Sequence, residues 1–221
     1  MALSTIRLVV FPQHTAPERF RPVPDRSVAL YGLDIETDTS VDGLDPARSP
    51  IVAVAVATDD GDHVFQGQET GILADLDTLL AHLPPGLVVT WNGAGFDLPF
   101  LAERARIIGA TIGLQLWRDP TIESDPGAFR GRWYRHDHLD GYRVYRADVG
   151  RSLGLSCGLK PLSRLVGLQP IELDRSSLHL LDDDVVRRYV ASDARLAKEL
   201  VLRRWPLAWR AADGCHTPVS H

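Results

Sequence analysis

Residues 28–37 read Val-Ala-Leu-Tyr-Gly-Leu-Asp-Ile-Glu-Thr, an apolar stretch that ends in two acids. The apolar run from Val28 to Ile35 predicts a buried β-strand. Because side chains alternate between the two faces of a strand, Asp34 and Glu36 are expected on the same face. The stretch therefore predicts a core strand that carries a pair of carboxylates at its end.

The segments after this strand alternate between strand and helix patterns. Asp60-Gly61 predicts a two-residue hairpin turn. Residues 113–135 are rich in Pro, Gly, Trp and Arg and are expected to be irregular, whereas residues 138–148 fit either a short strand or a helical turn. This order predicts an α/β fold with a mixed β-sheet and helices on both faces. Predicted strands cover 51–58, 62–66 and 87–91, and predicted helices cover 69–83, 96–108, 160–166 and 185–204.

The length of 221 residues and the hydrophobic content of 44% support one large domain. We place this domain at residues 26–206. Residues 1–25 are predicted to be an N-terminal extension, with an edge strand over 1–11 and a linker that contains four prolines. Residues 207–221 are predicted to be a C-terminal tail.

The composition excludes several classes of protein. The longest aliphatic run, Ile51–Ala57, is far shorter than the roughly 20 residues of a membrane-spanning helix. The N-terminus has no basic region followed by an apolar core, so no secretory signal is expected. Cys157 and Cys215 form neither a CxxC pair nor a zinc spacing, which favours free thiols in a reducing cytosol and a cytoplasmic location. With a net charge of −5, an anionic partner must be held by a local basic patch or by metal ions.

Two further acids extend the first pair. Asp97 follows the predicted strand at 87–91, at the first turn of a helix, and Asp193 lies four residues after Tyr189 on the same face of the last helix. Each has a simpler explanation by itself: a turn or cap residue, an acid favoured by the helix dipole, or a surface pair. Together the four acids occur where a metal-dependent phosphodiesterase needs them.

Three motifs carry a family resemblance. Asp34-Ile-Glu-Thr37, Thr90-Trp-Asn-Gly-Ala-Gly-Phe-Asp-Leu-Pro-Phe100 and Tyr189-Val-Ala-Ser-Asp193 resemble the three exonuclease motifs of the DEDD superfamily of 3′–5′ exonucleases, which have a ribonuclease H-like fold. The tyrosine four residues before the last Asp resembles the tyrosine subgroup (DEDDy). The segment Leu159–Leu168 is most similar to the proofreading domain of family B DNA polymerases. The resemblance covers about residues 28–204 and leaves 113–135 without a matching pattern.

The resemblance implies two divalent ions, Mg²⁺ or Mn²⁺, at the site. Asp34 would bridge both ions, Glu36 and Asp193 would complete the first metal site, and Asp97 would hold the second. Tyr189 would orient the attacking water, since a phenol with a pKa near 10 is a poor base at neutral pH. Hard oxygen ligands of this kind suit Mg²⁺ and Mn²⁺.

Substrate contacts are expected on both sides of the acids. Asn92, Phe96 and the backbone of Thr37 are expected to contact the terminal nucleotide, although Phe96 fits equally well as a core residue beneath the helix start. Arg143 and Arg146 belong to a segment, residues 130–151, in which six arginines are interleaved with aromatic residues. That mixture suits a single strand, with arginines on phosphates and rings under bases. The alternative is a solvated loop whose aromatic rings fold onto the core.

A second polar group lies close by. His136, His138 and Asp140 alternate, so on a strand all three would share a face. They fit either a transition-metal site or a polar strand edge, and the second is favoured because no second ligand cluster accompanies them.

Taken together, these patterns predict a metal-dependent 3′–5′ exonuclease that acts on the 3′ end of single-stranded nucleic acid, with DNA favoured over RNA. Two alternatives stay open at this point: an exoribonuclease or oligoribonuclease with the same chemistry, and a non-catalytic nucleic-acid-binding module.

Overall fold

The computed structural model describes residues 28–118 and 129–205. The predicted N-terminal extension over 1–25, with its edge strand, and the predicted tail over 207–221 lie outside the described residues. The described residues therefore include most of the predicted domain at 26–206. Residues 26–27, 119–128 and 206 of that domain lie outside them.

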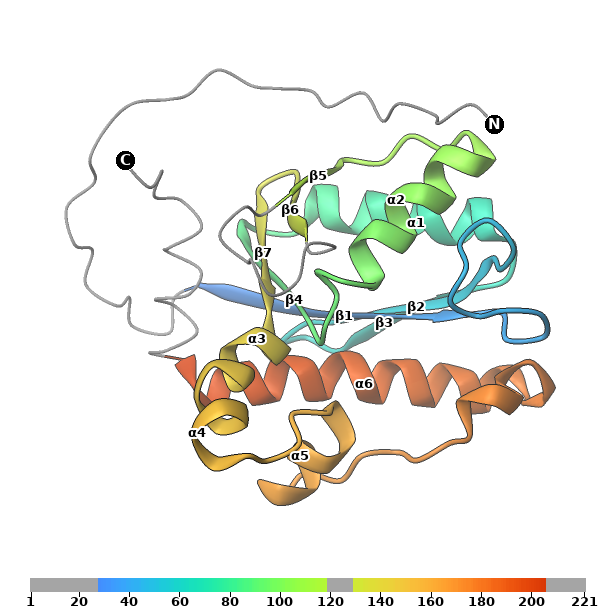
Figure 1. Ribbon diagram of the computed structural model, residues 1–221. Helices are drawn as coiled ribbons and strands as arrows, with labels where there is room; N and C mark the ends of the chain where they lie inside the picture. Colours follow the sequence, from blue (N-terminus) through green and yellow to red (C-terminus); the bar gives the residue numbers. More distant parts are fainter. Residues whose placement is uncertain (1–27, 119–128, 206–221) are drawn as a thin grey trace, which may run out of the picture.

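In the described part of the chain, seven strands form one sheet in the order β3-β2-β1-β4-β7-β6-β5 (Figure 1). Its first half is built around β1 (Ala29–Thr37), which pairs antiparallel with β2 (Ile51–Ala57) and parallel with β4 (Gly86–Thr90). The predicted hairpin turn joins β2 to β3 (Asp62–Gln66). The expectation of a mixed sheet is confirmed.

The second half of the sheet corrects the expectation of an irregular segment over 113–135. That segment contains β5 (Leu114–Arg118) and β6 (Phe129–Trp133), which pair antiparallel. Both strands are short and carry arginines on their exposed side, so their composition resembles that of a loop. Asp77 anchors the pair to the core by accepting hydrogen bonds from the Gly113 N–H and the Trp133 Nε1, each at 2.7 Å.

The segment 138–148 contains both of its predicted alternatives. β7 (His136–Asp140) ends in the sheet between β4 and β6. A helical turn, α3 (Gly141–Tyr145), follows at once, because the Asp140 carboxylate caps it by accepting a hydrogen bond from the Tyr142 N–H. The chain then continues through the π-turn Arg146–Gly150 and through α4 (Arg151–Leu153).

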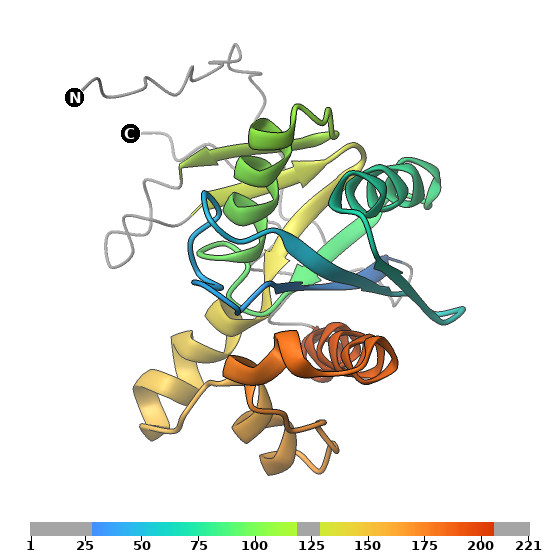
Figure 2. The same ribbon diagram turned by 90° about the vertical axis from the view of Figure 1, so that its right-hand side faces the viewer.

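Helices cover both faces of the sheet, as predicted (Figures 1 and 2). α1 (Glu69–His82) and α2 (Asp97–Ile108) pack on one face. α6 (Asp183–Arg203) packs on the other face, with α5 (Leu159–Leu165) on its outer side. The 3₁₀ turn η2 (Arg175–Leu180) precedes α6, and its Leu178 packs with residues of β2 and α6. None of the helices in the described ranges is long and apolar enough to cross a membrane.

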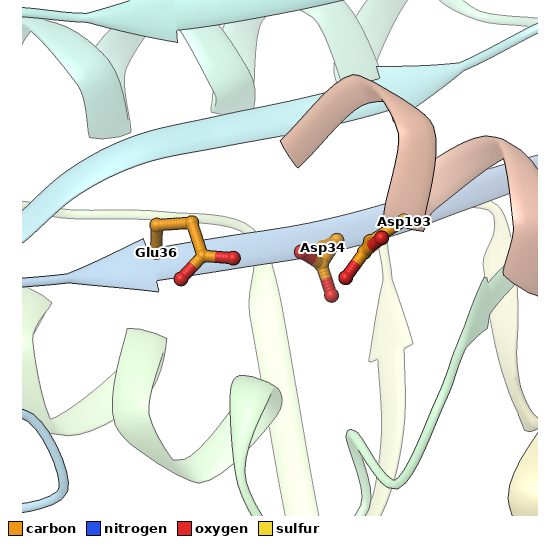
Figure 3. A group of neighbouring side chains, drawn as sticks. All are labelled: Asp34, Glu36 and Asp193. Carbon is orange, nitrogen blue, oxygen red and sulfur yellow. The ribbon is translucent and has the colours of Figure 1, made fainter. Parts of the chain in front are cut away.

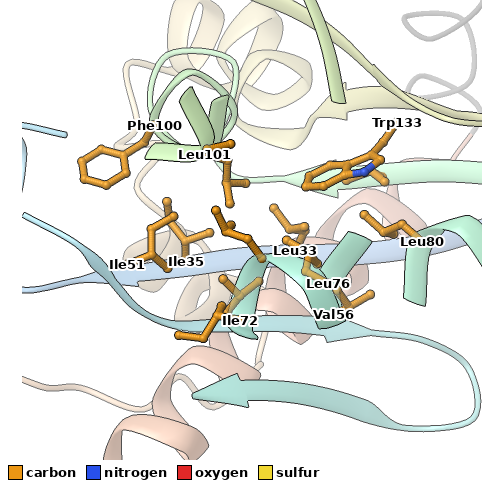
Figure 4. Packing of buried hydrophobic residues seen from close by; sticks show 14 of the residues in the cluster. Leu33, Ile35, Ile51, Val56, Ile72, Leu76, Leu80, Phe100, Leu101 and Trp133 are labelled. Atoms are coloured by element: carbon orange, nitrogen blue, oxygen red, sulfur yellow. The ribbon is translucent and has the colours of Figure 1, made fainter. Parts of the chain in front are cut away.

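Alternation along β1 divides the protein into two layers. Leu33 and Ile35 point into the core formed with α1 and α2 (Figure 4). The residues that alternate with them, Gly32 and Asp34, face α6 on the opposite side. One strand therefore supplies apolar side chains to the core and carboxylates to the other face.

The face beneath α6 is lined by small residues. Ala53 and Ala55 of β2 pack against Tyr189 and Val190 of α6 in one buried cluster. At Gly32 of β1, an added Cβ would overlap the backbone carbonyl of Ala194. α6 therefore lies against the backbone of β1, and this close approach brings residue 193 next to residue 34.

We expect Gly32→Ala to destabilise the protein by about 1–3 kcal/mol, because the new methyl group meets backbone and α6 must move away. Gly71→Ala is the matched control: Gly71 is exposed in α1, and an added Cβ meets nothing within 4 Å. Alanine is the better helix former, so this control should keep or raise stability. Urea unfolding followed by circular dichroism measures both, and an unchanged midpoint in Gly32→Ala would contradict the close packing.

Candidate metal centre

Three carboxylates meet where α6 crosses β1. Asp34 and Glu36 extend from β1, and Asp193 extends from α6 toward Asp34 (Figure 3). One carboxylate oxygen from each residue lies within 4.8 Å of the other two. The alternation of the strand and the helical face of Asp193 thus bring three of the four predicted acids together.

The surroundings of these carboxylates suit a hard divalent cation. Glu36 and Asp193 are buried, and Asp34 is half-buried. Within the described part of the chain, Asp34 Oδ2 and Glu36 Oε1 are buried without a hydrogen-bond partner. Buried anionic oxygens without partners are costly, and an oxygen-only donor set is the one that Mg²⁺ or Mn²⁺ prefers. The residues present therefore fit the predicted metal.

Burial and mutual repulsion hold protons on this cluster. Burial raises the pKa of Asp34 well above its usual range, and the charges of Asp193, Glu36 and Asp97 raise it further. Burial likewise raises the pKa of Glu36 to about 7, although the nearby Arg175 opposes the shift. Without a cation, the site is therefore partly protonated at neutral pH.

Asp97, the fourth predicted acid, stands beside this group. It is buried at the start of α2, and burial raises its pKa to about 7, opposed by hydrogen bonds from its own backbone N–H and that of Ile35. The pairing of β4 with β1 ends at Gly32, so the Asp97 side chain reaches the part of β1 that β4 has left. Asp97 is near enough to act on the pKa of Asp34 but lies outside the group of three, and its role at a second metal stays a prediction.

Tyr189 belongs both to the core and to the site. Its ring is buried against the alanines of β2, and its hydroxyl hydrogen-bonds Asp193, as the i, i+4 spacing predicts. Burial and the surrounding carboxylates raise the pKa of Tyr189 above its ordinary value of 10.0. The hydroxyl therefore stays protonated at neutral pH, so it acts as a hydrogen-bond donor and not as a base.

Two cations near the acids were missed from the sequence. Lys160 of α5 forms an ion pair with Asp193, and its Nζ lies 4.3 Å from the centre of the Tyr189 ring. Arg175 of η2 lies 3.6 Å from Glu36 Oε2. One feature of the sequence could have drawn attention to Lys160: nearly all basic residues are arginines, and lysine occurs only at positions 160 and 198. Nothing in the sequence pattern distinguished Arg175 from the other arginines.

Asp140 shapes the turn after β4, a role that the sequence did not reveal. Asn92 is exposed and has a left-handed backbone (φ 68°). The Asp140 carboxylate holds this turn, because it accepts hydrogen bonds from the Asn92 N–H at 2.9 Å and the Ala94 N–H at 3.2 Å. Asn92 is thereby presented to solvent beside α2.

Two other residues predicted to contact the substrate, Thr37 and Phe96, differ in how deeply they are buried. Thr37 is buried, and its hydroxyl donates to the Gly43 carbonyl at 2.6 Å. Phe96 is half-buried against the core beside Phe100, with ring centres 5.2 Å apart, which supports its alternative role as a core residue. The roles of Thr37, Asn92 and Phe96 toward a nucleotide stay predictions.

Arg143 and Arg146 lie in and after α3. Arg143 Nε is 3.7 Å from Asp140, and the Arg146 guanidinium stacks 5.8 Å from the centre of the Tyr142 ring. Arg146 is exposed and Arg143 is half-buried. Their predicted contact with a nucleic-acid strand is not tested by these positions.

His136, His138 and Asp140 have separate structural roles. His136 Nε2 is 2.8 Å from the Leu80 carbonyl, and His138 Nε2 is 2.7 Å from the Thr90 hydroxyl. Burial lowers the pKa of His138 to about 3, so its ring is neutral. Among the described residues these three form no metal-ligating group, and the preferred prediction of a strand edge is wrong, because β7 lies inside the sheet.

Comparison with known proteins gives a consistent picture of the fold. A family model described as the RNase_H superfamily matches residues 32–180. The family B DNA polymerase from Pyrobaculum calidifontis superimposes with a TM-score of 0.70 over 89% of this chain and 26% of that chain, at 20% identity. The ribonuclease H-like part of the fold prediction is thus confirmed.

Sequence relatives include DNA polymerases. This chain is 33% identical over 89 residues to a DNA polymerase of Archaeoglobus fulgidus, covering 40% of this chain and 11% of the polymerase. It is 24% identical over 207 residues to DNA polymerase 1 of Aeropyrum pernix, covering 81% of this chain and 21% of the polymerase. The chain therefore spans about a tenth to a fifth of the length of these relatives.

The raised pKa of Glu36 predicts a pH-dependent stability. Folding forces a carboxyl with an ordinary pKa of 4.5 into a site where its pKa is about 7. This shift lowers the free energy of unfolding. The loss is absent below about pH 4.5, grows as the pH rises, and is complete above about pH 7. Glu36→Gln removes it, so in EDTA this variant should melt above the wild type at pH 8, and the difference should shrink toward pH 5.

Thermal melting of both proteins from pH 5 to 8 measures this difference, and titrating groups that Glu36 does not influence, such as His138, contribute equally to both. Adding Mn²⁺ at pH 8 should raise the melting temperature of the wild type more than that of Glu36→Gln, because the variant has lost a ligand. A difference in melting temperature that does not vary with pH would contradict the raised pKa of Glu36.

Proposed function

Because this chain belongs to the RNase H superfamily, we propose that it is a metal-dependent 3′–5′ exonuclease of the tyrosine subgroup. Its substrate is the 3′ end of single-stranded DNA, with DNA favoured over RNA. The observation that carries this proposal is the convergence of Asp34, Glu36 and Asp193, whose carboxylate oxygens lie within 4.8 Å of one another. Similarity to archaeal DNA polymerases supports nucleic acid as the substrate class.

The metal ligands follow from the cluster. Asp34, Glu36 and Asp193 would hold one divalent cation, and Asp34 with Asp97 would hold a second. Two such cations, when bound, acidify the attacking water and offset the charge on the leaving oxygen. The buried, partnerless oxygens of Asp34 and Glu36 support this assignment, since a cation would satisfy them.

The chain's own residues position the reactants. The Tyr189 hydroxyl keeps its proton and sits beside Asp193, so it would orient the attacking water by hydrogen bonding. Lys160 neutralises part of the charge of Asp193 and rests on the Tyr189 ring, which holds both groups in place. Asn92, exposed on its left-handed turn, would contact the terminal nucleotide.

Asp34→Asn should lower the single-turnover rate on single-stranded DNA by roughly 10³-fold or more, because it removes the carboxylate shared by both predicted metals. The fold should survive, since the substitution also relieves repulsion among buried acids. Glu103→Gln is the control: Glu103 is an α2 surface acid paired with Arg106 and should keep full activity. The assay uses 5′-labelled and 3′-labelled strands of matched DNA and RNA, with Mg²⁺, Mn²⁺ or EDTA.

Each arm of this assay separates the proposal from its alternatives. Shortening of the 5′-labelled DNA strand in single-nucleotide steps supports 3′–5′ polarity. Degradation of RNA but not DNA would identify an exoribonuclease instead. Binding without cleavage under every metal condition would identify a non-catalytic module, and full activity in Asp34→Asn would overturn the mechanism.

Tyr189→Phe should reduce turnover by roughly 10- to 10³-fold and leave the melting temperature and substrate affinity near those of the wild type. The substitution keeps the buried ring that packs on β2 and removes only the hydroxyl beside Asp193. Single-turnover kinetics with Mg²⁺, together with thermal melting, measure both properties. A wild-type rate would assign Tyr189 to the core alone.

A further inference from the structure

Three of the ion pairs formed by buried or partly buried carboxylates among the described residues are built differently. Arg104 holds Glu69 with Nε at 2.8 Å and Nη2 at 2.5 Å, and both side chains are about 10% exposed. Lys160 and Asp193 are 16% and 8% exposed. Arg175 makes a single 3.6 Å contact with Glu36, and its side chain is 61% exposed while that of Glu36 is 3% exposed.

The Arg175 guanidinium is thus loosely held at a charged site. Within residues 28–118 and 129–205, none of its N–H groups makes a hydrogen bond to the protein. A guanidinium offers five such donors in a planar fork that matches a phosphate. Because Glu36 is buried and Arg175 is exposed, the arginine approaches the carboxylates from the solvent side.

The backbone beneath Arg175 is held firmly. Asp174 caps the turn η2 by accepting from the Ser176 N–H at 3.0 Å and the Ser176 hydroxyl at 2.7 Å. Leu178, further along η2, is buried against α6. His179 Nδ1 lies 3.1 Å from the Thr39 hydroxyl, which ties η2 to the loop after β1. Arg175 is therefore an exposed side chain on a turn that is held by hydrogen bonds and by packing against the core.

We propose that Arg175 is a substrate-binding residue that engages the phosphate of the 3′-terminal linkage of the strand. This inference rests on the proposed function, because it takes the carboxylate cluster as the reaction centre. A phosphodiester that enters the cluster meets the negative charges of Asp34, Glu36 and Asp193. Arg175 stands at the solvent side of these charges with unused donors, so it can exchange its weak contact with Glu36 for a bidentate contact with the phosphate.

A double-mutant cycle between Arg175 and the terminal phosphate tests this contact. The probe is a 5′-fluorescein single-stranded DNA whose last linkage is either a phosphodiester or an uncharged methylphosphonate. Binding is measured by anisotropy at low ionic strength, with Ca²⁺ in place of Mg²⁺ so that the strand is not hydrolysed. The proteins compared are the wild type, Arg175→Ala, Arg175→Lys and the control Arg106→Ala, which removes an exposed arginine from a surface pair on α2.

We expect Arg175→Ala to weaken binding of the phosphodiester strand by roughly 10-fold. The methylphosphonate should weaken binding to the wild type by roughly 10-fold more than binding to Arg175→Ala, because only the wild type has the Arg175 contact to lose, whereas any contact of the phosphate with Ca²⁺ is lost from both. Arg175→Lys should recover part of the affinity, since it keeps the charge and loses the fork. Arg106→Ala should behave as the wild type, and thermal melting verifies that each variant is folded.

Two outcomes would overturn the inference. One is that the losses from Arg175→Ala and from the methylphosphonate are independent of each other. The other is that Arg175→Ala changes Mn²⁺ affinity, measured by calorimetry, and leaves DNA affinity unchanged, which would make Arg175 a counter-charge for Glu36 alone. A wild type that couples to the phosphate but degrades no strand in Mg²⁺ would refute the exonuclease proposal and leave this contact standing, whereas degradation without coupling would refute only the contact.

Discussion

The close contact of α6 with the backbone of β1 at Gly32 is the constraint on which the site depends. No side chain larger than hydrogen fits between Gly32 and the Ala194 carbonyl, and β2 contributes Ala53, Ala55 and Ala57 to the cluster beneath the same helix. Asp193 directly precedes Ala194, so this contact sets its distance from Asp34. The same helix face carries Tyr189, whose ring fills the space beside those alanines. Packing of the helix and the position of the carboxylate cluster therefore depend on one interface.

The electrostatics of this interface oppose folding and favour ligand binding. Acids forced together by the fold have raised pKa values, mainly through burial. The protein offsets part of this repulsion with Lys160 from α5 and Arg175 from η2. Because the cluster of acids destabilises the fold, a divalent cation bound there would stabilise the protein, and functional sites commonly trade stability for binding in this way.

The remaining sheet positions the other side of the site. β7 contributes no ligand to the carboxylate cluster, yet Asp140 at its end holds the turn that presents Asn92 and begins α2 with Asp97. The hairpin of β5 and β6 is anchored through Asp77 and extends the sheet beyond β7. β5, β6 and β7 carry no exonuclease-like motif, yet β7 holds the turn after β4 that belongs to one.

The sequence by itself determined the elements with local periodicity and the residues they carry. The strand ending in Asp34 and Glu36, the helix with Tyr189 and Asp193, and the two layers of helices all follow from spacings of two or about four residues. Tertiary structure alone decided that Lys160 contacts Asp193, that Arg175 reaches Glu36, and that Asp140 shapes the turn at Asn92. It also decided that residues 114–118 and 129–133 are strands, because their pairing partners, and not their composition, stabilise them. Local patterns are encoded over a few neighbouring residues, whereas contacts between distant residues depend on how closely α6 and the outer helices pack on the sheet.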